Sequence, residues 1–293
     1  GDIKRSLHNE CTMFEAVDKN FKSLMKKTAK RNLALKATLG VAGLLNDLRR
    51  HNATLDQIQK QLNKYLETKR QSFPRFYFLS DDELLQILAN SNDPNKVQPH
   101  LKKCFDNINS LELEPNNSSR HIFAMISHEG ESVKFFDKNL KAQGYVEDWL
   151  KKVQNSMQDS LQKLMAEGKE TYEKTDRAQW GKEYPGQIVA TVSQVYWCYE
   201  TEAAIRGMEE NPESMDSWYV SNNYQLEQLV DLVRGPLTDI QRKIIVALIT
   251  TDVHGRDIIE MLRDEEVDSV RDFSWQQQLR YYWQSNLVVV RQI

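Results

Sequence analysis

A long apolar stripe between residues 44 and 70 limits the folds open to this chain more than any other feature. Its members recur at helical spacing, which predicts one amphipathic helix. At 1.5 Å per residue such a helix spans roughly 40 Å. That length exceeds the needs of a compact domain and favours a rod-like helical bundle. The stripe consists of Leu44, Leu48, Leu55, Ile58, Leu62 and Leu66.

Helical periodicity recurs over most of the remaining sequence, with clear punctuation between the segments. Ser80 followed by Glu83 has the spacing of a capping box and predicts a helix start. Before it, Phe76-Tyr77-Phe78 is expected to be a short extended run, and residues 32–43 an irregular joint. Further helices are predicted near 10–30, 94–105, 145–164, 187–208, 224–233 and 237–262.

Residues 107–136 have a different character. Runs rich in strand-forming residues, 108–113 and 122–126, flank turn-forming residues, which predicts an antiparallel pair. The predicted fold class is therefore mainly α: elongated helical bundles with a small inserted antiparallel β-element. We expect three parts, namely a helical segment at 1–70, short helices plus the β-element at 71–144, and a C-terminal bundle at 145–293 that ends in a strand.

The final strand, Leu287 to Ile293, needs a partner because a lone strand leaves its backbone groups unsatisfied. The sequence stops within this strand. We therefore expect the chain to be a piece of a longer protein.

Composition argues against several classes of function. The net charge of −3 gives no electrostatic case for nucleic-acid binding. The basic run from Lys22 to Arg31 fits a solvated helix face better than a binding site. No apolar stretch reaches the roughly 18 residues of a membrane span.

Three widely spaced cysteines, Cys11, Cys104 and Cys198, indicate reduced thiols in an intracellular protein rather than a disulfide framework or a metal knuckle.

Catalytic patterns are missing from the sequence. The Gly-Lys pairs at 168–169 and 181–182 are each followed by glutamate and lack the upstream glycine of a phosphate-binding loop. The polar run Asp252 to Asp257 suggests either a metal or acid–base site, or charged residues on a helix, and the second is favoured. Tyr281-Tyr282-Trp283 with Trp275 suggests a stacking platform, or core and interface packing, which is favoured. We predict no catalytic, cofactor or metal residue.

A resemblance to a known family rests on motifs spread along the chain. Tyr65-Leu66-Glu67-Thr68-Lys69-Arg70 leads into Phe73-Pro74-Arg75-Phe76-Tyr77-Phe78 and the capping segment, and this run resembles the linker of dynein heavy chains, in its axonemal form. The other matching stretches, in order, are Asp93-Pro94, Val97 to Phe105, Ser127-His128-Glu129-Gly130-Glu131, Val146-Glu147-Asp148-Trp149-Leu150, Tyr184-Pro185-Gly186-Gln187, Asp252-Val253-His254, Asp272-Phe273-Ser274-Trp275 and Gln278-Leu279-Arg280-Tyr281-Tyr282-Trp283.

The resemblance implies the C-terminal part of a linker, a helical arch that crosses a ring of six AAA+ modules and joins the first of them beyond Ile293. It implies that ATP and Mg²⁺ bind in the ring and not in this segment. The linker would act as a lever that the ATP cycle of the ring remodels. This remodelling would give the power stroke on microtubules in ciliary or flagellar beating. The implied partners are the ring, other heavy, intermediate and light chains, and microtubules, with neither nucleic acid nor membrane, in the axoneme.

Three groups of residues are expected to matter in such a lever. They are a ring-contact loop (Glu114, Pro115, Asn116, Asn117, Ser118), a junction to the first AAA+ module (Arg280, Tyr281, Tyr282, Trp283) and hinges (Gly40, Gly43, Phe73, Pro74, Gly235, Pro236).

A non-catalytic helical scaffold or adaptor stays open as the alternative function. The residues encoded after Ile293 would distinguish a linker from such a scaffold.

Overall fold

The computed structural model describes residues 2–30, 33–91, 93–115 and 120–292, and it is mainly helical with two small antiparallel sheets. The predicted fold class is confirmed. The chain divides into two compact units, one of residues 1–126 and 138–154, the other of residues 127–137 and 155–293. The predicted three-part division remains a prediction.

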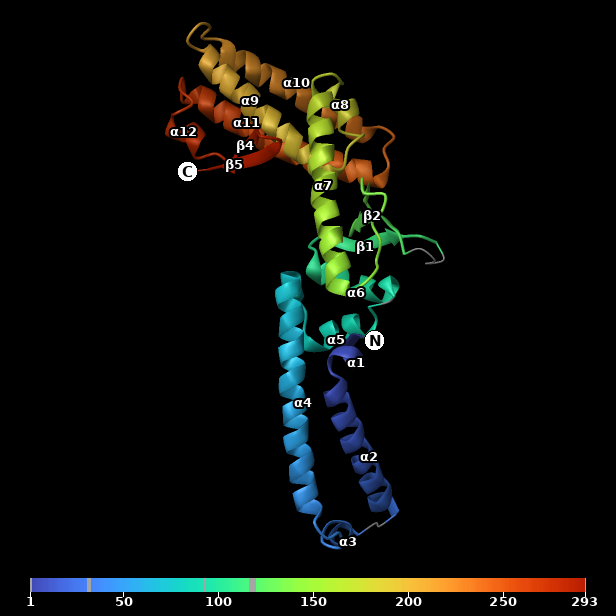
Figure 1. The fold of residues 1–293 in the computed structure, drawn as a ribbon. Coiled ribbons are helices and arrows are strands. Elements are labelled where there is room, and N and C mark those ends of the chain that lie inside the picture. The colour runs from blue at the N-terminus through green and yellow to red at the C-terminus, as the bar shows by residue number, and fades with distance from the viewer. Residues whose placement is uncertain (1, 31–32, 92, 116–119, 293) are drawn as a thin grey trace. The chain divides into compact units, whose positions relative to one another are not determined.

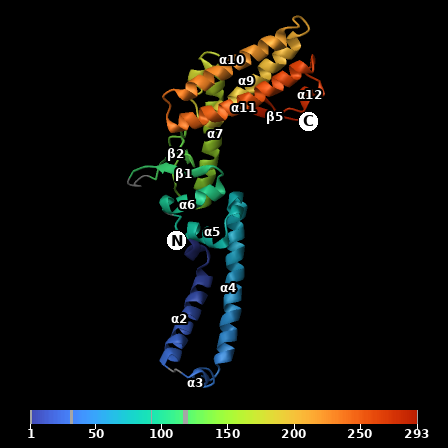
Figure 2. The ribbon, with the colours of Figure 1, turned by 180° about the vertical axis from the view of Figure 1, so that it is seen from behind.

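The first unit contains two long helices that lie side by side in antiparallel directions (Figures 1 and 2). The second of them is the helix that the leucine stripe predicts. The elements of the first unit are α1 (Asp2–Ser6), α2 (His8–Lys30), α3 (Ala34–Thr38), α4 (Leu44–Ser72), the 3-10 helix η1 (Pro74–Phe78), α5 (Asp81–Ala89), α6 (Pro94–Cys104), β1 (Ile108–Leu113) and most of β2 (Ile122–Ser127). The two long helices are α2 and α4.

The α2–α4 pair leaves much of its apolar surface open. Only Val17 of α2 is buried, and Phe14 and Phe21 remain about half exposed. An apolar groove of about 730 Å³ lies between the two helices, lined in part by Leu48 and Leu55 of the predicted stripe. Two helices alone cannot enclose both apolar faces, so the stripe is only partly buried.

Two local predictions for the first unit were wrong. Phe76-Tyr77-Phe78 belongs to the 3-10 helix η1 instead of an extended run. Pro74 has its ring at the first helical position, where no N–H is needed, and Phe76 is fully buried against Phe73 at 5.0 Å between ring centroids. Packing thus overrides the strand preference of three aromatic residues. The joint at 32–43 is not wholly irregular either, because it contains α3.

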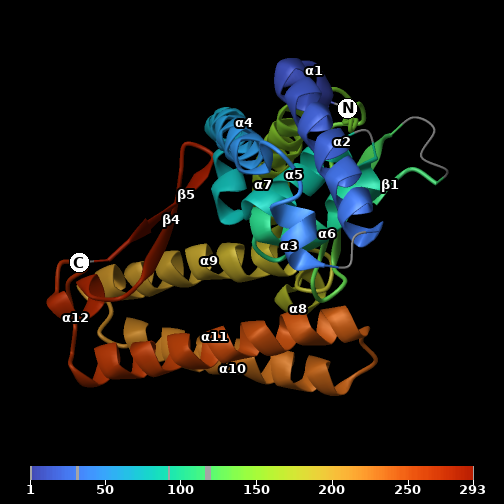
Figure 3. The ribbon, with the colours of Figure 1, turned by 90° about the horizontal axis from the view of Figure 1, so that it is seen from below.

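The second unit is a helical bundle with a terminal hairpin. Figure 3 shows α9, α10 and α11 side by side. The elements are β3 (Ser132–Lys134), α7 (Val146–Tyr172), whose first residues belong to the first unit, α8 (Arg177–Trp180), α9 (Gly186–Gly207), α10 (Ser214–Arg234), α11 (Asp239–Asp264), α12 (Phe273–Gln276), β4 (Arg280–Gln284) and β5 (Leu287–Arg291). The sheet of the β-element has the strand order β1-β2-β3.

Helix α10 begins ten residues earlier than the periodicity predicts. Its first turns contain serine, aspartate and asparagine, which are weak helix formers. Met215 and Trp218 nevertheless pack into the core beside Ile259 of α11. These tertiary contacts therefore stabilise the first turns of α10, which local helix propensity disfavours.

Helix α9 forms the centre of the second unit. It is buried over most of its length and takes part in two core clusters, one around Trp197 and Trp275, the other around Trp180 and Ile188. A helix that is apolar on nearly all sides is expected in a core rather than on a surface. No helix within the described residues is long and apolar enough to cross a membrane.

Candidate functional site

The predicted junction residues lie on the first strand of the terminal hairpin. Strands β4 and β5 pair antiparallel, with Tyr282 opposite Val289. Ser285 and Asn286 connect them, both with positive φ, as a tight two-residue hairpin turn requires. The strand at the end of the chain thus finds its partner in the aromatic segment just before it.

The hairpin is anchored on α9 through polar contacts. The backbone N–H of Tyr281 donates a hydrogen bond to Cys198 Sγ at 3.2 Å. The hydroxyl of Tyr282 donates to Glu202 Oε1 at 2.6 Å, and the indole N–H of Trp275 donates to the same oxygen at 3.3 Å. One carboxylate of α9, one turn beyond Cys198, therefore contacts both the hairpin and the segment that leads into it.

Burial around the anchor keeps the hydroxyl of Tyr282 and the thiol of Cys198 protonated. Burial, followed by the hydrogen bond to Glu202, raises the pKa of Tyr282 to about 12, so its hydroxyl remains a donor. Burial raises the pKa of Cys198 to about 11, which makes it a poor nucleophile. Arg280 is buried, and its Nη1 donates to the Tyr282 hydroxyl at 3.2 Å.

The aromatic residues of this region contribute to packing and to an open groove. Trp275 is fully buried and lies 5.6 Å from Trp197, centroid to centroid, so it belongs to the core. Tyr281 packs against the same cluster. Beside the hairpin, Tyr199, Tyr282 and Trp283 line a groove of about 440 Å³.

The polar run 252–257 is divided between the inside and the outside of α11. Asp252 is buried and accepts two hydrogen bonds from the Arg177 guanidinium, at 2.6 and 2.9 Å. His254 is exposed, and Arg256 pairs with its neighbour Asp257 at 2.5 Å. Among the described residues, no group of three or more histidine, cysteine, aspartate or glutamate side chains could hold a metal ion.

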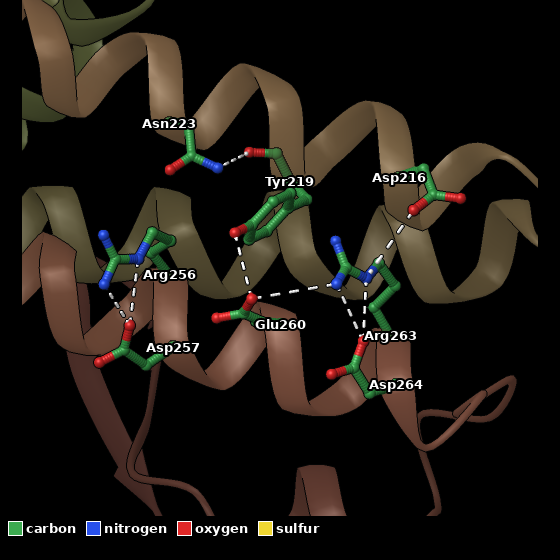
Figure 4. Close-up of polar contacts among 8 residues, drawn as sticks. All are labelled: Asp216, Tyr219, Asn223, Arg256, Asp257, Glu260, Arg263 and Asp264. Carbon is green, nitrogen blue, oxygen red and sulfur yellow. Dashed lines mark hydrogen bonds and ion pairs between the residues drawn. The ribbon is translucent and has the colours of Figure 1, made fainter.

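A second polar network covers the adjoining surface of α10 and α11 (Figure 4). Arg263 stacks over the Tyr219 ring at 4.5 Å and pairs with Asp264 at 2.9 Å. Longer contacts reach Asp216 at 3.9 Å and Glu260 at 4.0 Å. These side chains are substantially solvent-exposed, and exposed ion pairs stabilise a fold only slightly. The network therefore links the surfaces of the two helices.

The predicted ring-contact loop falls largely on residues that the structure does not describe. Glu114 and Pro115 follow β1, whereas Asn116, Asn117 and Ser118 lie outside the described residues. The backbone N–H of Glu114 donates to the carbonyl of His121, so the described part of this connection joins neighbouring strands.

The predicted hinge residues lie at three joints between helices. Gly40 and Gly43 precede α4, and Gly43 has a left-handed φ of 75°. Phe73 and Pro74 join α4 to η1, where Phe73 is only 2% exposed. Gly235 and Pro236 join α10 to α11. There, the carbonyl of Gly235 accepts a hydrogen bond from Arg242 at 3.0 Å.

Sequence reasoning missed the partners that hold the hairpin. Cys198 and Glu202 have the i, i+4 spacing of residues on one helix face, but their contacts lie about eighty residues further along the chain. The ion pair between Lys69 Nζ and Glu147 Oε1, at 2.6 Å, was likewise not predicted. Since neither residue of a distant pair carries a local signal, only the tertiary fold reveals them.

Comparison with known proteins places the chain in a family. Residues 1–168 match the family described as dynein heavy chain, N-terminal region 2. The chain is 42% identical to dynein axonemal heavy chain 6 of Homo sapiens over 98% of its length, and 42% identical to axonemal heavy chain 12 of Rattus norvegicus over 99%. It is 40% identical to axonemal heavy chain 1 of Rattus norvegicus over its full length.

These relatives are far longer than the present sequence, which spans 7%, 9% and 6% of them, respectively. The family match covers more than half of the chain, and the similarity to axonemal heavy chains extends beyond it to nearly every residue. The chain belongs to the dynein heavy chain family.

Proposed function

We propose that this chain is the C-terminal part of the linker of an axonemal dynein heavy chain. It acts as a lever that the ATP cycle of an AAA+ ring bends and straightens, which moves the motor along microtubules in a cilium or flagellum. The observation that carries the proposal is the similarity to axonemal heavy chains, at about 40% identity, over almost all of the sequence.

The stiffness of the elements supports a mechanical role. Helices α4, α7 and α11 contain 29, 27 and 26 residues, and the backbone hydrogen bonds of a helix are internal to it. Close-packed cores resist deformation. In the second unit, helices α9, α10 and α11 share such cores, so a force applied to one of them reaches the others.

ATP and Mg²⁺ are assigned to the ring of the whole heavy chain, not to this segment. Within the proposal, Arg280, Tyr281, Tyr282 and Trp283 lie at the junction to the first AAA+ module. The connection that starts at Glu114 contacts the ring in one nucleotide state. Heavy, intermediate and light chains of the dynein complex are the other partners.

A distance measurement in the full-length heavy chain tests the lever. A donor dye is attached at the exposed position of Tyr224 on α10, and an acceptor is placed on the ring. Energy transfer should differ between the ATP-bound and ADP-bound motor, because the lever moves relative to the ring. Identical transfer in every nucleotide state of an active motor would refute the proposal.

An internal pair of dyes provides the control. Both dyes are placed in the second unit, at the exposed positions of Tyr224 and Val246. Their energy transfer should remain constant through the cycle, since both positions belong to one compact unit. A change there would show that the dyes report local distortion instead of lever movement.

A further inference from the structure

Helix α9 is held at both ends by groups from distant parts of the second unit. At its N-terminus, Glu131 Oε1, from the turn between β2 and β3, accepts a hydrogen bond from the Gly186 backbone N–H at 2.9 Å. A carboxylate is favourable at that position because helix N-termini carry partial positive charge. Near the other end, Cys198 and Glu202 hold the terminal hairpin.

Glu202 accepts the shorter of the two hydrogen bonds described above between α9 and the hairpin. Its side chain is 13% exposed, and its 2.6 Å hydrogen bond from Tyr282 joins a charged acceptor to a phenol. Such bonds are shorter and stronger than bonds between neutral groups. The other oxygen accepts from Arg206, one turn further along α9, which orients the carboxylate.

The outer strand of the hairpin contributes little to its attachment. In β5, Leu287 and Val290 are 56% and 50% exposed, so apolar burial holds this strand weakly. Two further bonds, from Gln162 Nε2 to the carbonyl of Asn286 and from Gln292 Nε2 to the carbonyl of Gln277, are each 3.3 Å long and exposed. The orientation of the hairpin on α9 therefore depends chiefly on the contacts of β4, among which the Glu202–Tyr282 bond is the shortest.

We propose that Glu202 is a positioning residue that fixes the terminal hairpin on α9, so that movement of the hairpin is transmitted to the helix rather than lost at the joint. This inference rests on the proposed lever function. The chemistry is a carboxylate that accepts hydrogen bonds from Tyr282 and Trp275. A neutral side chain that keeps one acceptor oxygen at this place should retain the role only in part, because the charge strengthens the bond.

The experiment uses the full-length heavy chain with Glu202→Leu, Glu202→Gln and Tyr282→Phe. Hydrogen exchange of the Tyr281 amide, which donates to Cys198 of α9, reports hairpin attachment. The ratio of microtubule gliding velocity to ATP turnover reports transmission. Loss of a hydrogen bond to a charged group should speed exchange roughly tenfold or more in Glu202→Leu and Tyr282→Phe. Both variants should also move more slowly per ATP hydrolysed. Glu202→Gln keeps an acceptor oxygen without the charge, so it should lie between the wild type and Glu202→Leu in both measurements.

Matched controls are Glu227→Leu and Tyr224→Phe on α10, where both side chains are exposed. They should change neither measurement. Tyr282→Phe removes one oxygen atom only, so it remains informative if Glu202→Leu fails to fold.

Two outcomes would overturn the inference. Unchanged exchange in Glu202→Leu and Tyr282→Phe would show that the bond does not fix the hairpin. Faster exchange with an unchanged velocity per ATP would show that hairpin attachment does not govern transmission. Neither outcome bears on the energy transfer between lever and ring in the wild type, so failure of the lever itself is recognised separately.

Discussion

Lys69 and Glu147 form an ion pair that is almost withdrawn from solvent. Their side chains are 11% and 8% exposed, and the ammonium also lies 4.7 Å from the ring centre of Tyr145. Replacing Lys69 by Met leaves the carboxylate buried without its cation. Loss of one partner of a buried pair typically costs about 3–5 kcal/mol. We expect a reduction of that order in the free energy of unfolding, measured by urea denaturation.

A double variant distinguishes the pair from simple loss of packing. Lys69→Met combined with Glu147→Leu removes both charges and should recover most of the lost stability, because no unpaired charge remains. The control is Lys174→Met, which breaks the exposed pair with Glu170 and should have little effect. A double variant that is no more stable than Lys69→Met would contradict this explanation.

Glu200 couples the stability of the second unit to pH. Burial raises its pKa to about 7 from an ordinary value of 4.5, although the nearby Arg177 opposes the shift. The raised pKa means that folding favours the protonated acid. Its contribution is therefore fully present below about pH 4.5, declines as pH rises from about 4.5 to about 7, and is lost above that range.

The variant Glu200→Gln tests this linkage, since it resembles the protonated acid at every pH. At pH 8 the variant should be more stable than the wild type by up to about 3 kcal/mol. The two melting temperatures should converge as pH falls towards about 4.5. An equal difference at all pH values would mean that Glu200 does not titrate as described.

At the scale of elements, two capping boxes define helix starts. Ser80 with Glu83 begins α5, and Thr238 with Gln241 begins α11. In each, the hydroxyl accepts from a first-turn N–H and the longer side chain accepts from the N–H of the cap residue. Ser80→Ala and Thr238→Ala should each cost about 1 kcal/mol in unfolding free energy.

Hydrogen exchange locates that loss. The first-turn amides of α5 should exchange faster in Ser80→Ala but not in Thr238→Ala, and the converse should hold for α11. Glycine replacements at the two caps serve as controls, because glycine costs only a few tenths of a kcal/mol relative to the natural cap residues. Faster exchange along the whole helix would indicate global destabilisation instead of a lost cap.

Local signals also decide how much of the fold was predictable. The box at Ser80 predicted α5 correctly because its partners lie three residues apart, and the stripe of leucines predicted α4. The 3-10 helix at Phe76 and the early start of α10 at Ser214 were mispredicted. Burial of their apolar side chains in the core stabilises both, although local propensity disfavours them. The anchor at Glu202 was missed because Tyr282 is eighty residues away.

At the scale of the whole molecule, the structure explains why the two Gly-Lys pairs, at 168–169 and 181–182, do not form a phosphate-binding loop. Gly168 lies within helix α7, where an added Cβ would meet Ile188 at 2.9 Å, and Gly181 caps the short helix α8. Neither glycine therefore begins an open loop whose N–H groups could surround a phosphate, as nucleotide sites of that type require. Both are explained by close packing and helix termination.

We therefore expect the 293-residue chain on its own to neither bind nor hydrolyse ATP. Calorimetric titration with MgATP should give no saturable heat, and phosphate release should match a blank without protein. The full-length heavy chain, assayed alongside, should hydrolyse ATP under the same conditions and thus shows that the assay works. Saturable binding of MgATP by the 293-residue chain would contradict this expectation.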